Sequence, residues 1–355
     1  MSDAGREPLP CSSLAARGLA ALFAAGLRAL ATLLVPRRTP APARPVANDG
    51  PVVLVVPVLP DLSHTFVYRE VLALLRHRPD WRVLVLADNP RAPVHADAKA
   101  LRPLVQYLRR DGIVRAALRA GRWLLTRRGR ALFSMYRAHD DLGALLGKHP
   151  LRDPRHPGNA FLLADQLAPL RPRHVHVYAS TWPANVAMGA ATLLGVPFSI
   201  SSYVDFEFPY AHALLAEKVA RARFFRVVTA HCRERLLALP TAHTTPTTRI
   251  PVVLLGLDLA NWRQPATPRG EGTLVSAARL VPKKGLHLLP PALAQLRQSG
   301  LVCHWRVVGD GPERPRLERL CQEHGIADLV TFLGPRDNAA VRDELLTADL
   351  AVLPC

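Results

Sequence analysis

The sequence has few cysteines and lacks the cysteine spacings that build metal sites. Its five cysteines, Cys11, Cys232, Cys303, Cys321 and Cys355, include no C-x-x-C pair and no Cys–His spacing that would close a zinc site. We therefore expect reduced thiols in a cytoplasmic protein. The sequence also lacks a G-x-G-x-x-G segment after the expected first strand of either domain, and this absence disfavours a dinucleotide-binding oxidoreductase.

Acidic residues are scarce as well, with 28 Asp and Glu against 46 Lys and Arg, which gives a formal charge of +18. This excess suits an anionic partner such as phosphate esters or acidic lipid head groups. A GC-rich coding sequence would produce the same Arg-rich profile. No recognisable nucleic-acid-binding motif accompanies the charge, so we expect no nucleic-acid partner.

What is present is the composition of a globular protein. Hydrophobic residues make up 49% and charged residues 21% of 355 residues, which is enough for two α/β domains of ordinary size. We expect a leader and a Pro-rich linker over residues 1–49. Arg17 and Arg28 interrupt the apolar part of the leader, so it favours a helix in the membrane interface over a transmembrane span; an unstructured extension explains the composition equally well.

Strand and helix patterns alternate from residue 50 to residue 263, as in a Rossmann-like domain with a parallel sheet. The strands are expected at 52–56, 82–86, 174–178, 197–201, 225–229 and 250–255, and the helices at 65–76, 184–194 and 214–224. A basic, helical insert occupies residues 96–148. It reads either as a solvated helix pair or as a surface that meets acidic lipid.

After an expected linker at 264–272, a second α/β series fills residues 273–355. Its strands are expected at 273–277, 305–308, 330–333 and 350–353, and its helices at 285–298, 313–324 and 338–347. Pro290 and Pro291 fit poorly inside the first of these helices, so we expect a break or a short first turn there.

Two loops of this second series carry the strongest chemical signal. Arg279-Leu280-Val281-Pro282-Lys283-Lys284-Gly285 follows a strand and opens a helix, a setting in which cations can receive a diphosphate. Lysine occurs at only five positions in the chain, and two of them are in this loop. Gly309-Asp310-Gly311-Pro312 follows the next strand, where ligands of open α/β sheets bind.

These loops resemble those of the family-4 retaining glycosyltransferases, which have the GT-B fold. The segments that follow in series add to the resemblance: Phe332-Leu333-Gly334 and Ala348-Asp349-Leu350-Ala351-Val352-Leu353-Pro354. The resemblance implies two Rossmann-like domains facing a cleft. It implies that Arg279 and Lys284 hold the diphosphate of a nucleotide-sugar donor and act in catalysis without a required metal or cofactor. It also implies that Gly309, Asp310 and Gly311 line the nucleoside pocket of the donor site, to which Pro312 also belongs.

The first domain adds Pro60-Asp61-Leu62-Ser63-His64-Thr65-Phe66-Val67-Tyr68-Arg69-Glu70, which is similar to a segment of exopolysaccharide and colanic-acid-type members. This likeness places Ser63 and Thr65 on the acceptor side; helix capping by these hydroxyls is an equal alternative. Tyr203 stands where the family commonly has a sugar-site His, with Asp205 as a displaced carboxylate. Tyrosine cannot replace imidazole in proton transfer near neutral pH, because its ordinary pKa is about 10.

The family's Glu-x7-Glu motif should follow Pro354, so we expect an incomplete second domain and little activity of the chain as given. The expected function is transfer of a hexose to a glycan or lipid-linked acceptor in exopolysaccharide or cell-surface polysaccharide biosynthesis. The expected location is the cytoplasm, with peripheral contact to the inner face of an acidic membrane. The alternative is an inactive glycosyltransferase remnant.

Overall fold

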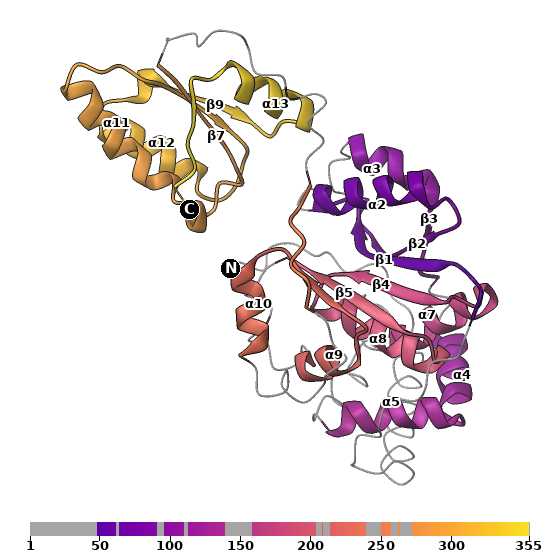
Figure 1. Ribbon diagram of the computed structural model, residues 1–355. Coiled ribbons are helices and arrows are strands. Elements are labelled where there is room, and N and C mark those ends of the chain that lie inside the picture. Colours follow the sequence, from indigo (N-terminus) through magenta and orange to yellow (C-terminus); the bar gives the residue numbers. More distant parts are fainter. Residues whose placement is uncertain are drawn as a thin grey trace. The chain divides into compact units, whose positions relative to one another are not determined.

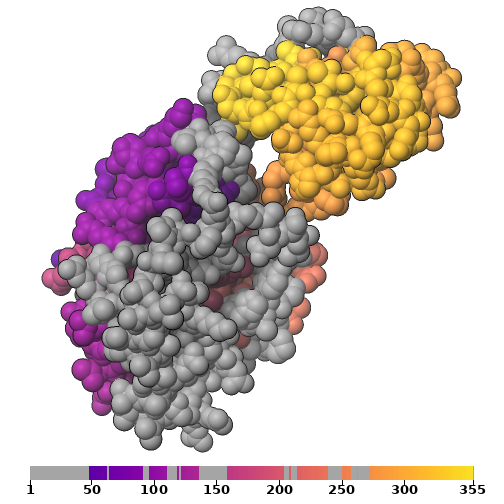
Figure 2. Space-filling model, turned by 180° about the vertical axis from the view of Figure 1, so that it is seen from behind, coloured from indigo at the N-terminus to yellow at the C-terminus, as the bar shows by residue number. Residues whose placement is uncertain are grey.

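The structure is a computed structural model that describes residues 48–61, 64–90, 96–109, 113–138, 158–203, 208, 214–238, 250–256, 262 and 272–354. The chain divides into two compact units, Met1–Leu255 and Gly256–Cys355. The space-filling view shows the second unit, in orange to yellow, as a compact body of its own (Figure 2). Nearly all of the predicted leader and of the predicted linker lies outside the described residues. The expected α/β class is confirmed, because both units are built on parallel sheets.

The first unit contains a six-stranded sheet in the order β3-β2-β1-β4-β5-β6, and its paired strands are all parallel (Figure 1). The strands are β1 (Val52–Leu59), β2 (Arg82–Asp88), β3 (Val105–Tyr107), β4 (His174–Tyr178), β5 (Phe198–Ser202) and β6 (Phe225–Val227). The strand order reverses between β1 and β4, the point at which open α/β sheets usually bind ligands. The short strand β3 was not predicted.

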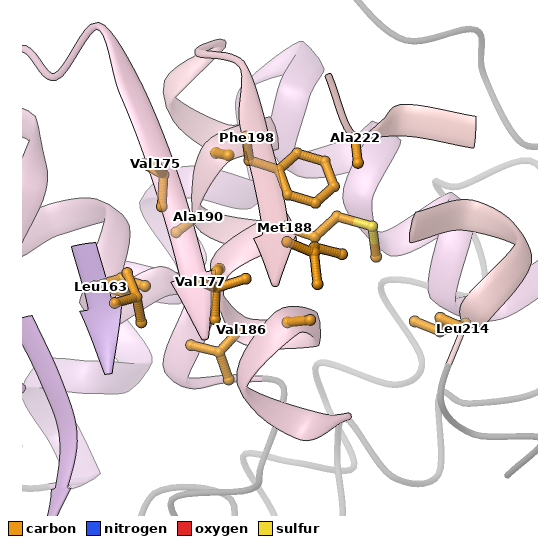
Figure 3. Packing of buried hydrophobic residues seen from close by; sticks show 14 of the residues in the cluster. Leu163, Val175, Val177, Val186, Met188, Ala190, Phe198, Leu214 and Ala222 are labelled. Atoms are coloured by element: carbon orange, nitrogen blue, oxygen red, sulfur yellow. The ribbon is translucent and has the colours of Figure 1, made fainter. Parts of the chain in front are cut away.

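Helices cover both faces of this sheet, which explains the continuous apolar run of β1. Val52, Leu54 and Val56 pack with α2 and α3, whereas Val53 and Val55 face a cluster formed largely by α7 and α8. Figure 3 shows Val175, Val177 and Phe198 of the strands packed against Val186, Met188 and Ala190 of α8. The helices are α2 (Thr65–His77), α3 (Ala96–Leu101), α4 (Ile113–Leu124), α5 (Arg127–Ala138), α7 (Asn159–Leu167), α8 (Trp182–Leu194), α9 (Leu215–Arg221) and α10 (Ala230–Leu237).

The predicted strand at 250–255 is wrong. Only an isolated bridge joins Val252 to Val227 of β6. Pro251 has no N–H to donate to a ladder, and the side chains beyond it are exposed, with Leu254 at 73%. Helices α7 and α10 were also absent from the prediction.

The described part of the basic insert packs one side into the core, while Leu118 of α4 is 67% exposed. Leu132, Phe133 and Met135 of α5 are buried. Arg119 and Arg122 of α4 form ion pairs with Asp165 of α7, at 3.3 and 2.6 Å, and the Trp123 Nε1–H donates to the same carboxylate at 2.8 Å. These arginines therefore fasten α4 to α7. Residues 139–148 of the insert lie outside the described residues.

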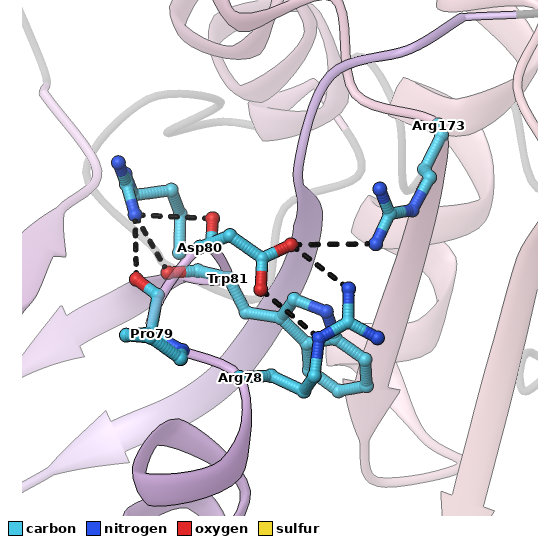
Figure 4. A network of polar contacts seen from close by, with 6 residues as sticks. Arg78, Pro79, Asp80, Trp81 and Arg173 are labelled. Carbon is cyan, nitrogen blue, oxygen red and sulfur yellow. Dashed lines mark hydrogen bonds and ion pairs between the residues drawn. The ribbon is translucent and has the colours of Figure 1, made fainter.

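Another group of cations braces the loop between α2 and β2, at the amino end of the sheet (Figure 4). Asp80 accepts hydrogen bonds from Arg78 at 2.9 and 3.0 Å and from Arg173 at 3.4 Å. The bond from Arg78 is the main reason that the pKa of Asp80 lies below its usual value. Part of the positive charge of the chain is thus used within the fold.

The second unit has a four-stranded parallel sheet in the order β10-β7-β8-β9. The strands are β7 (Thr273–Ala277), β8 (His304–Val308), β9 (Val330–Gly334) and β10 (Leu350–Ala351), and the helices are α11 (Leu289–Gln298), α12 (Arg314–Glu323) and α13 (Asn338–Thr347). Helices α11 and α12 pack on one face, around Trp305 and Leu293. Because β10 lies on the opposite side of β7 from β8, the crossover helix α13 lies on the other face (Figure 1).

The helix predicted from Gly285 begins only at Leu289. Gly285 takes a left-handed conformation with φ 65°, between the 3-10 turns Pro282–Lys284 and Leu286–Leu288. Pro290 and Pro291 then occupy the first turn of α11, where a missing N–H does not break the helix. The expected short first turn is confirmed, but the cationic loop does not lead directly into an α-helix.

Candidate functional site

The site in the second unit lies at the reversal of its strand order. Strands β8 and β9 continue to one side of β7, and β10 returns to the other side, so the crevice expected for a ligand lies outside the carboxyl ends of β7 and β10. The loop containing Arg279 and Lys284 leaves β7 at this edge. A Cβ atom placed on Gly285 would lie 3.2 Å from the carbonyl oxygen of Pro354, just after β10. The cationic loop and the end of β10 are therefore in contact.

Short backbone bonds define the course of the cationic loop. The N–H of Val281 donates to the Arg279 carbonyl, and the N–H of Lys284 donates to the Val281 carbonyl, both at 2.9 Å. The side chain of Arg279 is exposed, and it forms no ion pair with the residues that the structure describes. The loop thus presents the Arg279 guanidinium to solvent at the carboxyl edge, with two lysines in the turn that follows.

The predicted donor-binding segment, Gly309 to Pro312, packs directly on the cationic loop. A Cβ atom on Gly309, whose φ is +130°, would lie 1.9 Å from the Ala278 carbonyl oxygen, and one on Gly311 would lie 2.3 Å from the Leu280 carbonyl oxygen. The Leu280 N–H donates to the Asp310 carbonyl at 2.9 Å, and the Gly309 N–H donates to the Gly334 carbonyl at 2.8 Å. The two loops pack so closely that only glycine, which has no Cβ, fits at positions 309 and 311.

Asp310 and Pro312 are exposed at the same edge. The Asp310 carboxylate accepts a hydrogen bond from the Gly311 N–H at 2.8 Å. The neighbouring carboxylate of Glu313 is paired with Arg316 at 2.9 Å. The structure therefore brings together Arg279, Lys284, Gly309, Asp310, Gly311 and Pro312, all of which the sequence singled out for a donor site.

Sequence reasoning missed the polar residues that hold β10 in the sheet. The Ser276 hydroxyl donates to the Val352 carbonyl at 2.6 Å and accepts from Trp305 Nε1–H at 3.0 Å. The Asp349 carboxylate accepts from the Thr273 N–H at 2.9 Å. The sequence does place a serine within the apolar strand Thr273–Ala277. Because a buried hydroxyl requires a hydrogen-bond partner, this serine could have indicated such a contact.

On the first unit, the Arg69-Glu70 pair of the predicted acceptor-side segment has a structural explanation. Arg69 forms an ion pair with Asp97 of α3 at 3.0 Å, and Glu70 forms one with Arg226 of β6. Thr65 is the first residue of α2, and the cap residue before it, His64, makes no side-chain cap bond. Capping by Thr65 is therefore wrong. Ser63 lies outside the described residues, as does Asp205.

Tyr203 lies just after β5, and its ring meets that of Phe66 edge to face with centroids 4.6 Å apart. Burial raises the pKa of Tyr203, and the nearby Glu70 carboxylate raises it further, so the phenol is neutral. The same two causes raise the pKa of Tyr178 at the end of β4. No local pattern indicates that Tyr178 and Arg226 are neighbours of Tyr203, because they come from other strands that lie far away in the sequence.

A row of imidazoles and hydroxyls, buried except for the half-buried His174, runs across β4 and β5. His174 Nε2 and His176 Nδ1 each lie 2.7 Å from the Ser199 hydroxyl, and His176 Nε2 lies 3.0 Å from that of Ser201. Burial, followed by the nearby Arg223, lowers the pKa of His174 to about 4. Burial, His174 and Arg226 lower the pKa of His176 to about 3. Both imidazoles are neutral in the folded protein near pH 7.

The two neutral histidines, His174 and His176, predict that the folded protein loses stability in acid. The folded pKa values lie below the unfolded value of about 6.5, so stability is complete above pH 6.5 and falls as pH drops towards 4 and 3. We expect a loss of roughly 1.4 kcal/mol per pH unit for each histidine below pH 6. Urea denaturation between pH 7.5 and 5 measures this slope, and His176→Gln should reduce it. The same slope in the variant would contradict the prediction.

Within the described residues, no helix has the length and apolar character needed to cross a membrane. In the same part of the chain, no group of three or more His, Cys, Asp and Glu side chains is placed to hold a metal ion.

Comparison with known proteins gives a match over the second unit. Residues 260–355 match the family described as glycosyl transferases group 1. The chain is 33% identical over 114 residues to a protein named colanic acid biosynthesis glycosyltransferase WcaL of Escherichia coli, covering 31% of this chain and 27% of that protein. It is 37% identical over 87 residues to a GDP-mannose-dependent phosphatidylinositol monomannoside mannosyltransferase of Mycobacterium tuberculosis, covering 23% and 22%. The chain spans about a quarter of the length of these curated relatives.

Solved structures match over both units. HepE of Anabaena, in complex with UDP, gives a TM-score of 0.58 at 14% identity and covers 85% of this chain and 73% of that chain. The lipopolysaccharide outer core galactosyltransferase WaaB, in its apo form, gives a TM-score of 0.53 at 14% identity, with the same coverage. The chain therefore has the α/β fold of the GT-B glycosyltransferases, and its residues 260–355 match the glycosyl transferases group 1 family.

Proposed function

We propose that the protein transfers a hexose from a nucleotide-diphosphate sugar to a glycan or lipid-linked acceptor. The observation that carries this proposal is the position of Arg279 and Lys284 at the strand-order reversal of the second unit. Open α/β sheets bind ligands at such a reversal, and cations on a loop there suit a diphosphate. The match of this unit to glycosyl transferases group 1 supports the same assignment.

The two cations would act when the bond between the sugar and the diphosphate breaks. The departing phosphate oxygen then gains negative charge, and a guanidinium and an ammonium already in place stabilise that charge more than they stabilise the intact donor. We propose that this stabilisation suffices without a metal ion. Retention of the anomeric configuration is part of the proposal and rests on the family resemblance.

The first unit would receive the acceptor at the carboxyl edge of its own sheet. Tyr203 lies near this edge with a neutral phenol, so it can donate a hydrogen bond but cannot serve as a base near pH 7. Thr65 begins the helix that follows β1, next to the reversal between β1 and β4. These positions support a role in binding rather than in proton transfer.

The acceptor class is inferred from the relatives. Their names concern colanic acid biosynthesis, a phosphatidylinositol mannoside and, for a Rhizobium meliloti protein that is 40% identical over 73 residues, the lipopolysaccharide core. We propose a role in exopolysaccharide or cell-surface polysaccharide synthesis at the cytoplasmic face of a membrane. Transfer to lipid-linked oligosaccharides should exceed transfer to the same free glycans, and the opposite ranking would contradict a lipid-linked acceptor.

Titration of the chain with UDP and with GDP tests the donor site directly. We expect at least one of them to bind, and Arg279→Ala to weaken that binding by about tenfold or more, because a charge-assisted hydrogen bond contributes roughly 1.5–3 kcal/mol. Arg319→Ala, which removes an exposed arginine of α12, is the matched control and should leave the affinity unchanged. Absence of binding, or equal effects of the two substitutions, would contradict the assignment.

A further inference from the structure

Backbone hydrogen bonds join the loops that leave β7 and β8 to each other and to the carboxyl ends of β8 and β9. The Ala278 N–H donates to the Val308 carbonyl at 3.0 Å, and the Glu313 N–H donates to the Leu280 carbonyl at 3.0 Å. The bonds from Leu280 to Asp310 and from Gly309 to Gly334 continue the pattern. We call these four bonds the loop ladder.

Arg279 occupies the centre of this arrangement. The residues on its two sides, Ala278 and Leu280, are the ones that Gly309 and Gly311 approach. A Cβ atom on Gly309 would lie 1.9 Å from the Ala278 oxygen and 2.9 Å from its carbonyl carbon. A Cβ atom on Gly311 would lie 2.3 Å from the Leu280 oxygen. Real Cβ atoms do not approach backbone atoms so closely, so any larger residue must displace one of the peptide groups that flank Arg279.

We infer that Gly309 and Gly311 are positioning residues that act on the donor diphosphate through Arg279, rather than groups that line a pocket for the nucleoside. The inference rests on the proposed function. A displacement of about 1 Å in a charged group is enough to weaken a directional hydrogen bond to phosphate, because such bonds fall off steeply with distance and angle. The glycines then matter for any ligand that carries the diphosphate, whether or not a nucleoside is attached.

Two ligands separate the two roles. The chain and its Gly311→Ala variant are titrated with UDP and with inorganic diphosphate. If Gly311 acts through Arg279, the substitution should lower the affinity for both ligands by the same factor, about tenfold. If Gly311 lines a nucleoside pocket, the affinity for UDP falls and the affinity for inorganic diphosphate does not. This result would overturn the inference.

A double-mutant cycle gives an independent test. Gly311→Ala should weaken UDP binding in the parent chain but have almost no further effect in an Arg279→Ala background, because the group that it displaces is already gone. Additive effects would overturn the inference. Gly325→Ala is the matched control: Gly325 also has a positive φ, of 66°, but no atom lies within 4 Å of the added Cβ. It should retain the parent affinity.

A milder substitution covers the case in which Gly311→Ala does not fold. Asp310→Ala removes the carboxylate that accepts from the Gly311 N–H and introduces no steric clash at the two glycines. It should lower the affinities for UDP and for inorganic diphosphate equally. A fall in the affinity for UDP alone would count against the inference. If the unaltered chain binds no UDP, GDP or inorganic diphosphate, the proposed function fails and this inference fails with it.

Discussion

Lys284→Ala is expected to abolish sugar transfer, lowering turnover by about 100-fold or more. This is the range observed when one preorganised group that stabilises developing negative charge is removed from an enzyme. Lys284 closes the 3-10 turn Pro282–Lys284, and its N–H donates to the Val281 carbonyl, so the backbone fixes this residue in the loop that leaves β7. Release of nucleoside diphosphate from radiolabelled donors, in a preparation that transfers sugar, measures the effect.

Lys283→Ala is the matched control, because it removes the same charge one residue earlier from an exposed position. Its turnover should remain within a few-fold of that of the parent protein. Equal losses in the two variants would show that only the summed charge of the loop matters. Unchanged turnover in Lys284→Ala would remove Lys284 from the diphosphate site.

Trp305→Ala is expected to destabilise the second unit by about 3–5 kcal/mol, the usual range for a large aromatic residue removed from a core. Trp305 is fully buried among α11, α12 and the sheet, and its indole N–H is bonded to Ser276. The same Ser276 hydroxyl holds the Val352 carbonyl, so the substitution also weakens the attachment of β10. Urea denaturation followed by circular dichroism should show an earlier transition for this unit.

Trp305→Phe separates packing from hydrogen bonding. Phenylalanine keeps most of the apolar contact but cannot donate to Ser276, so we expect a loss of about 1 kcal/mol. If Trp305→Ala were no more destabilising than Trp305→Phe, the core around Leu293 and Leu317 would not depend on the indole as described.

The second unit was nearly predictable from the sequence. Strand Thr273–Ala277 and helix Asn338–Thr347 have the bounds that their patterns indicate. The helix start at Leu289 differed from the prediction because Gly285 adopts a left-handed conformation between two 3-10 turns, which delays the α-helix by four residues. Arg279 and Lys284 could be proposed as site residues from the sequence because both lie on one short loop after a clear strand, and their role in donor binding stays a prediction.

The first unit was less predictable, because its important contacts join distant residues. Glu70 and Arg226 are separated by 156 residues, and no local pattern indicates their ion pair. Arg119 and Arg122 of α4 looked like part of a basic surface, because their partner Asp165 follows 43 residues or more later. Tyr203 could be recognised as a departure from the pattern that the sequence resembles, but the burial that keeps its phenol neutral required the structure.

The loop ladder also affects the dynamics of the second unit. Backbone amides of Ala278, Leu280, Gly309 and Glu313 lie outside the strands and helices, yet each donates to a carbonyl of a neighbouring loop or of a strand end. Such amides exchange slowly with solvent when the segment opens only together with the sheet. A diphosphate would then meet a loop whose conformational entropy had been lost during folding, so binding would not have to order it.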